Sequence, residues 1–186
     1  MKRSFDLLMS VFALVVLMIP AILVALIVRL TSKGPIIYWS DRVGQYNKVF
    51  KMPKFRTMCI DTPAVATHLM INAEQHLTPV GSFFRKSSLD ELPQLWSIMK
   101  GDMAFVGPRP ALFNQGDLIS LRTSQGVHEL VPGVTGWAQI QGRDELPIPK
   151  KVEMDVYYLQ HQSLLFDLKI LWQTVFAVLK WKGVSH

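Results

Sequence analysis

The feature that most constrains this chain is an apolar stretch near its N-terminus. Leu7 to Val28 is a run of 22 residues without a charge and with a single hydroxyl, at Ser10. As a straight helix it would be about 33 Å long, enough to cross the hydrocarbon core of a bilayer. It is too long for a signal peptide, and Arg29 follows where small residues would form a cleavage site. We therefore expect it to stay in the mature protein as a membrane helix.

The path of this helix is open between two alternatives. Pro20 lacks a backbone donor and its ring clashes with the carbonyl of Val16, so we expect a kink or break there. Basic residues flank both ends, and such residues favour the cytoplasmic side of a membrane. A helix that enters, bends at Pro20 and returns satisfies both observations, and a proline-kinked single span is the alternative. The flanking residues are Lys2, Arg3, Arg29 and Lys33.

The basic charge is concentrated beside the apolar segment. Residues 1–60 hold nine Lys and Arg against two Asp, whereas residues 61–186 hold eleven basic and twelve acidic residues. Such an excess next to an apolar helix favours anionic lipid headgroups or phosphorylated ligands. We expect no nucleic-acid partner, because no DNA- or RNA-binding motif accompanies the basic stretch. The single cysteine, Cys59, permits no intrachain disulfide, which fits a reducing cytoplasmic compartment.

The predicted fold is α+β and mostly helical, with a membrane helix over residues 1–31 and one small domain over 32–186. Two apolar runs, 36–39 and 49–55, are separated by a turn at 44–47 and predict a short hairpin. Loop, short strand and loop are expected over 132–143. Helices are expected over 64–76, from 89 or 93 to 100, over 150–161, and over the apolar stripe at 164–179.

Two surfaces of this domain have two interpretations each. The second arm of the hairpin is basic, and is either a solvated strand face or an arm that faces phosphate. The C-terminal stripe is broken by Asp167, Lys169 and Gln173 into pieces too short to span a membrane. It is either an amphipathic helix lying on the bilayer or a core helix. The basic residues of the arm are Lys48, Lys51, Lys54 and Arg56.

Two adjacent carboxylates, Asp90 and Glu91, form the centre of the stretch from 85 to 110. Ser88 followed by Glu91 matches a capping box, in which both side chains satisfy free N–H groups at a helix start. A capping box does not explain the second carboxylate, nor the nearby Arg85 and Arg109. Carboxylates that attack phosphorus or hold Mg²⁺, beside arginines that neutralise phosphate oxygens, are typical of phosphoryl chemistry.

The sequence resembles the bacterial sugar transferases, the monotopic phosphoglycosyl transferases, from about residue 2 to residue 183. The shared motifs are long and stand in the same order as in the family. After the apolar segment with its central proline, they are Lys54-Phe-Arg-Thr-Met58, Ser88-Leu-Asp-Glu-Leu-Pro-Gln-Leu95, Lys100-Gly-Asp-Met103, Val106-Gly-Pro-Arg-Pro110, Pro132-Gly-Val-Thr-Gly-Trp137, Asp155-Val-Tyr-Tyr158 and Asp167-Leu-Lys-Ile170.

The resemblance implies a reaction and a set of site residues. Members move a sugar 1-phosphate from a nucleotide sugar, commonly a UDP-sugar, onto a polyprenyl phosphate and release a nucleoside monophosphate. Asp90 would be the nucleophile that holds a covalent phosphosugar, with Mg²⁺ beside it, and Glu91 the general base or orienting carboxylate. Lys54, Arg85, Arg109 and Arg143 are the expected phosphate contacts.

The resemblance also implies a place in the cell. It favours the re-entrant path for the N-terminal helix and the interfacial path for the C-terminal one, so the expected location is the bacterial inner membrane with the site on the cytoplasmic face. Ile19 precedes Pro20 where many members have serine, which leaves the details of the bend open. A homo-oligomer is possible, and neither the sugar nor the base can be told from the sequence.

Overall fold

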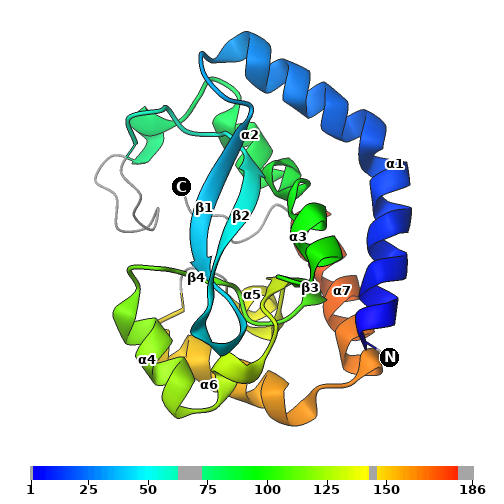
Figure 1. Ribbon diagram of the computed structural model, residues 1–186, viewed down its shortest axis with the longest axis vertical. Coiled ribbons are helices and arrows are strands. Elements are labelled where there is room, and N and C mark those ends of the chain that lie inside the picture. Colours follow the sequence, from blue (N-terminus) through cyan, green and yellow to red (C-terminus); the bar gives the residue numbers. More distant parts are fainter. Residues whose placement is uncertain (1, 63–72, 143–145, 180–186) are drawn as a thin grey trace.

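The computed structural model describes residues 2–62, 73–142 and 146–179. The protein is α+β and mostly helical, as expected, with one long apolar helix at its N-terminus. The helix expected over 64–76 lies largely outside the described residues, and its end forms a single 3₁₀ turn, η3, over Ala73–His76. Figure 1 shows a hairpin at the centre, helix α1 (Lys2–Thr31) along one edge, and helices α4 (Gly116–Ser124) and α6 (Ile148–His161) at the base.

The expected hairpin is present as strands β1 (Ile37–Val43) and β2 (Val49–Phe55), which pair antiparallel in full register. The turn between them contains the 3₁₀ turn η1 (Gln45–Asn47). A two-residue strand, β4 (Ala111–Leu112), pairs with the other edge of β1. Strands β3 (Ala104–Val106) and β5 (Gly133–Thr135) form a separate parallel pair. These two sheets hold the loops on which the candidate site is built.

The remaining helices are mostly short. The predicted helix ending at Lys100 is present and stops at Gly101, whose φ of 96° is the left-handed conformation that glycine adopts readily. The 132–143 segment has its short strand, but a helix follows where loop was expected. The elements are α2 (Gly81–Lys86), η4 (Leu89–Glu91), α3 (Gln94–Lys100), α4 (Gly116–Ser124), η5 (Val127–Glu129), α5 (Trp137–Gln141), α6 (Ile148–His161) and α7 (Leu164–Leu179).

Helix α1 (Lys2–Thr31) continues through Pro20 instead of breaking there, and Figure 1 shows its axis changing direction along its length. It is long and apolar enough to cross a membrane by length and composition, and 11% of its most apolar window is buried within the protein. Most of its apolar side chains are therefore exposed. The largest exposed ones include Leu8, Phe12, Val15, Ile19, Leu23 and Leu30.

Both ends of α1 are fixed to the rest of the protein. At its start, Lys2 forms an ion pair with Asp167 of α7, and the guanidinium of Arg3 donates to the last carbonyls of α3. At its end, Val24 and Val28 pack into a buried cluster with Phe55 and Phe84. The guanidinium of Arg56 then donates to the carbonyls of Ser32 and Lys33, just past the helix. Arg56, one of the basic residues of the hairpin's second arm, therefore holds the segment that follows α1 in place.

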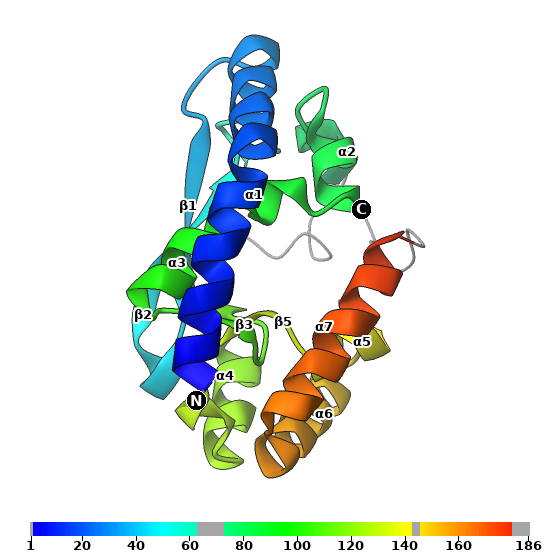
Figure 2. The same ribbon diagram turned by 90° about the vertical axis from the view of Figure 1, so that its right-hand side faces the viewer.

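Helix α7 has one side packed against the core and an exposed apolar side, so the core interpretation of its stripe is confirmed for part of the helix and the bilayer contact stays a prediction. Ile170 is fully buried, and the carboxylate of Asp167 accepts a hydrogen bond of 2.6 Å from the hydroxyl of Tyr158 on α6. Figure 2 shows α1 and α7 along the same side of the molecule. The large apolar side chains that α7 leaves exposed are Leu164, Leu165, Leu168, Trp172, Val175 and Phe176.

Candidate active site

The carboxylates of Asp90 and Glu91 lie in the 3₁₀ turn η4, directly before α3. The chain enters this turn through Ser88, whose φ of 58° is left-handed, and Pro93 is the N-cap of α3. The predicted capping box does not form, because Ser88 makes no side-chain cap hydrogen bond and the carboxylate of Glu91 binds a lysine. An N-cap residue usually has an extended backbone, and the left-handed conformation of Ser88 departs from that geometry. Both carboxylates still precede the N-terminal end of a helix.

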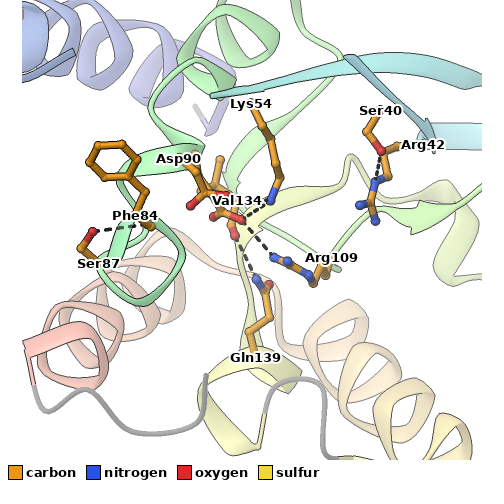
Figure 3. A network of polar contacts seen from close by, with 10 residues as sticks. Ser40, Arg42, Lys54, Phe84, Ser87, Asp90, Arg109, Val134 and Gln139 are labelled. Atoms are coloured by element: carbon orange, nitrogen blue, oxygen red, sulfur yellow. Dashed lines mark hydrogen bonds and ion pairs between the residues drawn. The ribbon is translucent and has the colours of Figure 1, made fainter. Parts of the chain in front are cut away.

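Lys54 brings a positive charge to both carboxylates from the hairpin. Its Nζ donates to Glu91 Oε1 at 2.7 Å and lies 3.7 Å from Asp90 Oδ2. The exposed fraction of each of these three side chains is 17% or less. Figure 3 shows the side chains of Lys54 and Arg109 converging on the region beside Asp90. Lys54 is therefore not on a solvated strand face, because its side chain is mostly buried against the two carboxylates.

The two neighbouring carboxyl groups have opposite shifts in pKa. Burial raises the pKa of Asp90 from 3.8 to about 6, against the opposing charge of Lys54 and with a further rise from the charge of Glu91. Burial acts in the same direction on Glu91, but the charges of Lys54 and Arg109 outweigh it and lower its pKa from 4.5 to about 2. Glu91 is thus ionised at any physiological pH. Asp90 gains or loses its proton just below neutrality.

Arg109 reaches the site from a loop that the backbone holds closely. Its Nη1 lies 3.5 Å from Glu91 Oε1. The loop follows β3 and is hydrogen-bonded to β5. Gly107 N donates to Thr135 O and Gly133 N donates to Pro108 O, both at 2.9 Å. A Cβ on Gly107 would collide with the carbonyl of Val131, so only glycine allows this approach. The Gly-Pro-Arg-Pro and Pro-Gly-Val-Thr-Gly motifs are therefore one structural unit.

Two other residues, Arg85 and Arg143, were predicted to contact phosphate, and the structure describes only Arg85. Arg85 lies in the last turn of α2, and its charge lowers the pKa of Asp90, so it belongs to the electrostatic surroundings of the site. Arg143 lies outside the described residues. The structure brings together Asp90, Glu91, Lys54 and Arg109, with Arg85 beside them.

Two side chains near this group were missed from the sequence. Arg42 of β1 lies on the same side of the hairpin as Lys54 (Figure 3), where its charge lowers the pKa of Glu91 and its Nη1 donates to Pro110 O at 3.2 Å. Gln139 of α5 donates to Val134 O at 2.9 Å, and its buried Oε1 has no partner within the described part of the chain. The strand alternation that pairs residue 38 with 54 and 42 with 50 could have indicated Arg42.

The donor set is compatible with magnesium. No cluster of three His, Cys, Asp or Glu side chains that could hold a metal gathers among residues 2–62, 73–142 and 146–179. Mg²⁺ often uses only one or two carboxylates and completes its shell with water and substrate phosphates. Asp90 fits this role better than Glu91, because Lys54 makes its short hydrogen bond to Glu91 and lies farther from Asp90.

Comparison with known proteins shows the family. The sequence profile described as bacterial sugar transferase matches residues 1–181. The chain belongs to the bacterial sugar transferase family. Asp90, Glu91, Lys54 and Arg109 lie within the matched residues, so the group described above is part of the family's shared domain.

Individual relatives of this transferase cover either a chain of similar size or part of a longer one. An uncharacterized sugar transferase of Bacillus subtilis, EpsL, is 39% identical over the whole chain, which covers 91% of that protein. The UDP-glucose:undecaprenyl-phosphate glucose-1-phosphate transferase of Escherichia coli is 38% identical over 95% of the chain. The undecaprenyl-phosphate galactose phosphotransferase of Salmonella typhimurium is 33% identical over 98% of it. The chain spans only 39% and 42% of the length of these last two.

Proposed function

We propose that the protein transfers a sugar 1-phosphate from a UDP-sugar to undecaprenyl phosphate through a covalent phosphosugar on Asp90. The observation that carries this proposal is a buried pair of carboxylates facing Lys54 and Arg109 in a member of the sugar transferase family. Relatives that share the domain are named for transfer of glucose, galactose and N-acetylgalactosamine phosphates to undecaprenyl phosphate. The reaction would begin assembly of a surface polysaccharide or glycoconjugate.

The first half of the reaction is an in-line displacement at the sugar-bearing phosphorus. A carboxylate oxygen of Asp90 forms a bond to that phosphorus, and the bond to the bridging oxygen of UMP breaks. UMP leaves with the electron pair. Lys54 and Arg109 lie where they can neutralise the oxygens of the diphosphate as charge moves onto the leaving group. Mg²⁺ held by Asp90 and the diphosphate would supply further charge neutralisation.

The second half returns Asp90 to its free form. A phosphate oxygen of undecaprenyl phosphate bonds to the same phosphorus, and the bond to the Asp90 oxygen breaks. The products are a polyprenyl-diphosphate sugar and the free carboxylate. Glu91, which Lys54 and Arg109 keep ionised, orients the incoming lipid phosphate and accepts a proton if that phosphate is protonated.

The fold suggests how the site meets its lipid substrate. Both ends of α1 contact the same catalytic domain, Lys2 and Arg3 at the start and the backbone of Ser32 and Lys33 at the end. A helix tied to one domain at both ends supports entry and return on the same face of a membrane. We therefore propose residues 1–31 as a re-entrant helix, residues 32–186 as the cytoplasmic domain, and the exposed apolar side of α7 as a contact with the bilayer of the inner membrane.

Product analysis tests the reaction. Purified protein in detergent would be given undecaprenyl phosphate, MgCl₂ and UDP-glucose, UDP-galactose or UDP-N-acetylgalactosamine, with UMP release as the readout. Release that requires undecaprenyl phosphate supports a transferase. Release at the same rate without the lipid would indicate a hydrolase, and no release with any donor would favour a non-catalytic scaffold or another donor class. Retained turnover in Asp90→Asn would rule out the covalent mechanism.

A cysteine scan tests the path of α1. In a Cys59→Ser background, a cysteine placed before Lys2 and one at Lys33 should both react with an impermeant maleimide only after the cytoplasmic face is opened. Cys59 is exposed, so its removal is needed for a clean signal. Labelling of the N-terminal cysteine in intact spheroplasts would show that α1 crosses the membrane.

A further inference from the structure

The loop that carries Arg109 is fixed at four successive residues. Strand contacts hold Gly107 N and Pro108 O at 2.9 Å each. Arginine side chains hold the next two carbonyls: Arg122 Nη1 donates to Arg109 O at 2.8 Å, and Arg42 Nη1 donates to Pro110 O at 3.2 Å. Each of these four residues thus has a backbone group held by a hydrogen bond. A short loop held in this way has little freedom, so the elements around it fix the position from which the Arg109 side chain extends.

Arg122 is itself held in place by Asp155. Both Arg122 Nε and Nη2 donate to Asp155 Oδ2, at 2.9 and 2.7 Å. The exposed fractions of the two side chains are 11% and 2%. A planar guanidinium with three bonds in two directions is rigid, and a lysine could not reproduce this geometry. The pair links α6 and α4 to the carbonyl of the residue that faces Glu91.

The ion pair of Arg122 and Asp155 is not explained by a contribution to stability alone. Replacing a buried ion pair with well-packed apolar residues is often neutral or stabilising, so burial of Arg122 and Asp155 is weak evidence for a stability role. What distinguishes the pair is its third contact, the carbonyl of Arg109. Asp155 also opens the Asp-Val-Tyr-Tyr motif, whose residues take no part in the chemistry proposed above.

We propose that Asp155 and Arg122 are positioning residues, which orient Arg109 toward the diphosphate of the nucleotide sugar by holding its backbone carbonyl. They touch neither substrate nor the reacting phosphorus, and act only through Arg109. This proposal rests on the proposed function for its effect on turnover. Its effect on the loop is independent of that function.

The first test is a double-mutant cycle on UMP release from a UDP-sugar in the presence of undecaprenyl phosphate. Asp155→Asn should lower kcat/KM by about 10- to 100-fold, since misplacement of a positioned group by about 1 Å can cost about 100-fold. In an Arg109→Met background the same substitution should cost less than about 3-fold, because the group it positions is gone. Equal losses in both backgrounds would show a general structural effect and overturn the proposal.

The second test needs no turnover. Amide hydrogen exchange of the full-length protein in detergent reports opening of the Gly107 N–H bond to Thr135 O. Exchange there should accelerate in Asp155→Asn and stay unchanged in Glu153→Gln, which breaks the exposed pair with Lys150 on the same helix. Unchanged exchange in Asp155→Asn would overturn the proposal even if activity falls.

Arg122→Lys keeps the positive charge but loses the planar guanidinium and its three hydrogen bonds. This variant replaces Asp155→Asn in both tests if Asp155→Asn does not fold. It should reproduce the activity loss and the faster exchange, and wild-type behaviour in either measurement would contradict the proposal. If the wild-type protein releases no UMP from any UDP-sugar, the proposed function fails. The exchange measurement then decides the positioning proposal alone.

Discussion

Asp90→Asn should remove activity and yet stabilise the fold at alkaline pH. In the wild-type protein, burial raises the pKa of the Asp90 carboxyl group from 3.8 to about 6. A group with a raised folded pKa stabilises the protein below its unfolded pKa, and this contribution is lost as pH rises through the folded value. At pH 8 the ionised carboxylate therefore costs about 3 kcal/mol, from about two pKa units at 1.36 kcal/mol each. Asparagine removes that cost.

Glu91→Gln is the matched control with the opposite sign. The pKa of Glu91 is lowered from 4.5 to about 2, because Lys54 and Arg109 outweigh burial. Its ionised form stabilises the fold above pH 4.5, and that contribution is lost as pH falls through 2. Removing the charge should destabilise the protein by about 3 kcal/mol at pH 8. Both substitutions are nearly isosteric and adjacent in sequence, so the comparison isolates the charge.

Thermal unfolding in one detergent measures both effects. For a chain of this size 1 kcal/mol shifts Tm by about 2–4 °C, so at pH 8 the Asn variant should melt about 6–12 °C higher and the Gln variant lower by a similar amount. At pH 5 the gain of the Asn variant should fall to about half, as Asp90 becomes protonated in the wild type. Shifts of the same sign in the two variants, or a gain that does not depend on pH, would refute the reasoning.

Further predictions concern turnover and the loop. The rate at which a radiolabelled UDP-sugar labels the enzyme should rise with pH through about 6 and then level off, since Asp90 must be ionised to attack; a flat profile would contradict this. Lys54→Met should move that rise to higher pH, because the charge of Lys54 lowers the pKa of Asp90, and an unmoved profile would place Lys54 outside the site. Gly107→Ala should lower stability by about 1–3 kcal/mol in denaturant melts through its collision with Val131 O, and wild-type stability would show that the loop can shift. EDTA should stop UMP release and MgCl₂ restore it, whereas release that resists EDTA would argue against magnesium.

Local patterns in the sequence predicted the elements that depend on nearby residues. The hairpin, the helix that ends at Gly101 and the helices over 150–161 and 164–179 are present, because turn residues and apolar spacing act over short distances. The five-residue helix Trp137–Gln141 was expected to be loop. It has too few residues for a helical period, and Trp137 owes its place to packing against Tyr157 and Phe166.

Long-range contacts account for what the sequence could not predict. The capping box was predicted from a local pattern. It does not form, because the backbone of Ser88 is left-handed and Glu91 accepts a hydrogen bond from Lys54 instead. The pairing of β3 with β5 joins segments almost thirty residues apart and has no local signal. Arg122 was missed for the same reason, because its role depends on a carbonyl that the fold brings next to it.

The division of labour between the two carboxylates follows from the position of one lysine. Lys54 Nζ is 2.7 Å from Glu91 Oε1 but 3.7 Å from Asp90 Oδ2, so the shorter bond goes to Glu91, which does not attack phosphorus in the proposed mechanism. A nucleophile held by a short ion pair would have to break that bond before attacking phosphorus. Asp90 instead keeps a pKa near 6 and is mostly ionised at neutral pH without such a bond. In the proposed mechanism, Lys54 then remains close enough to Asp90 to contact the diphosphate of the nucleotide sugar.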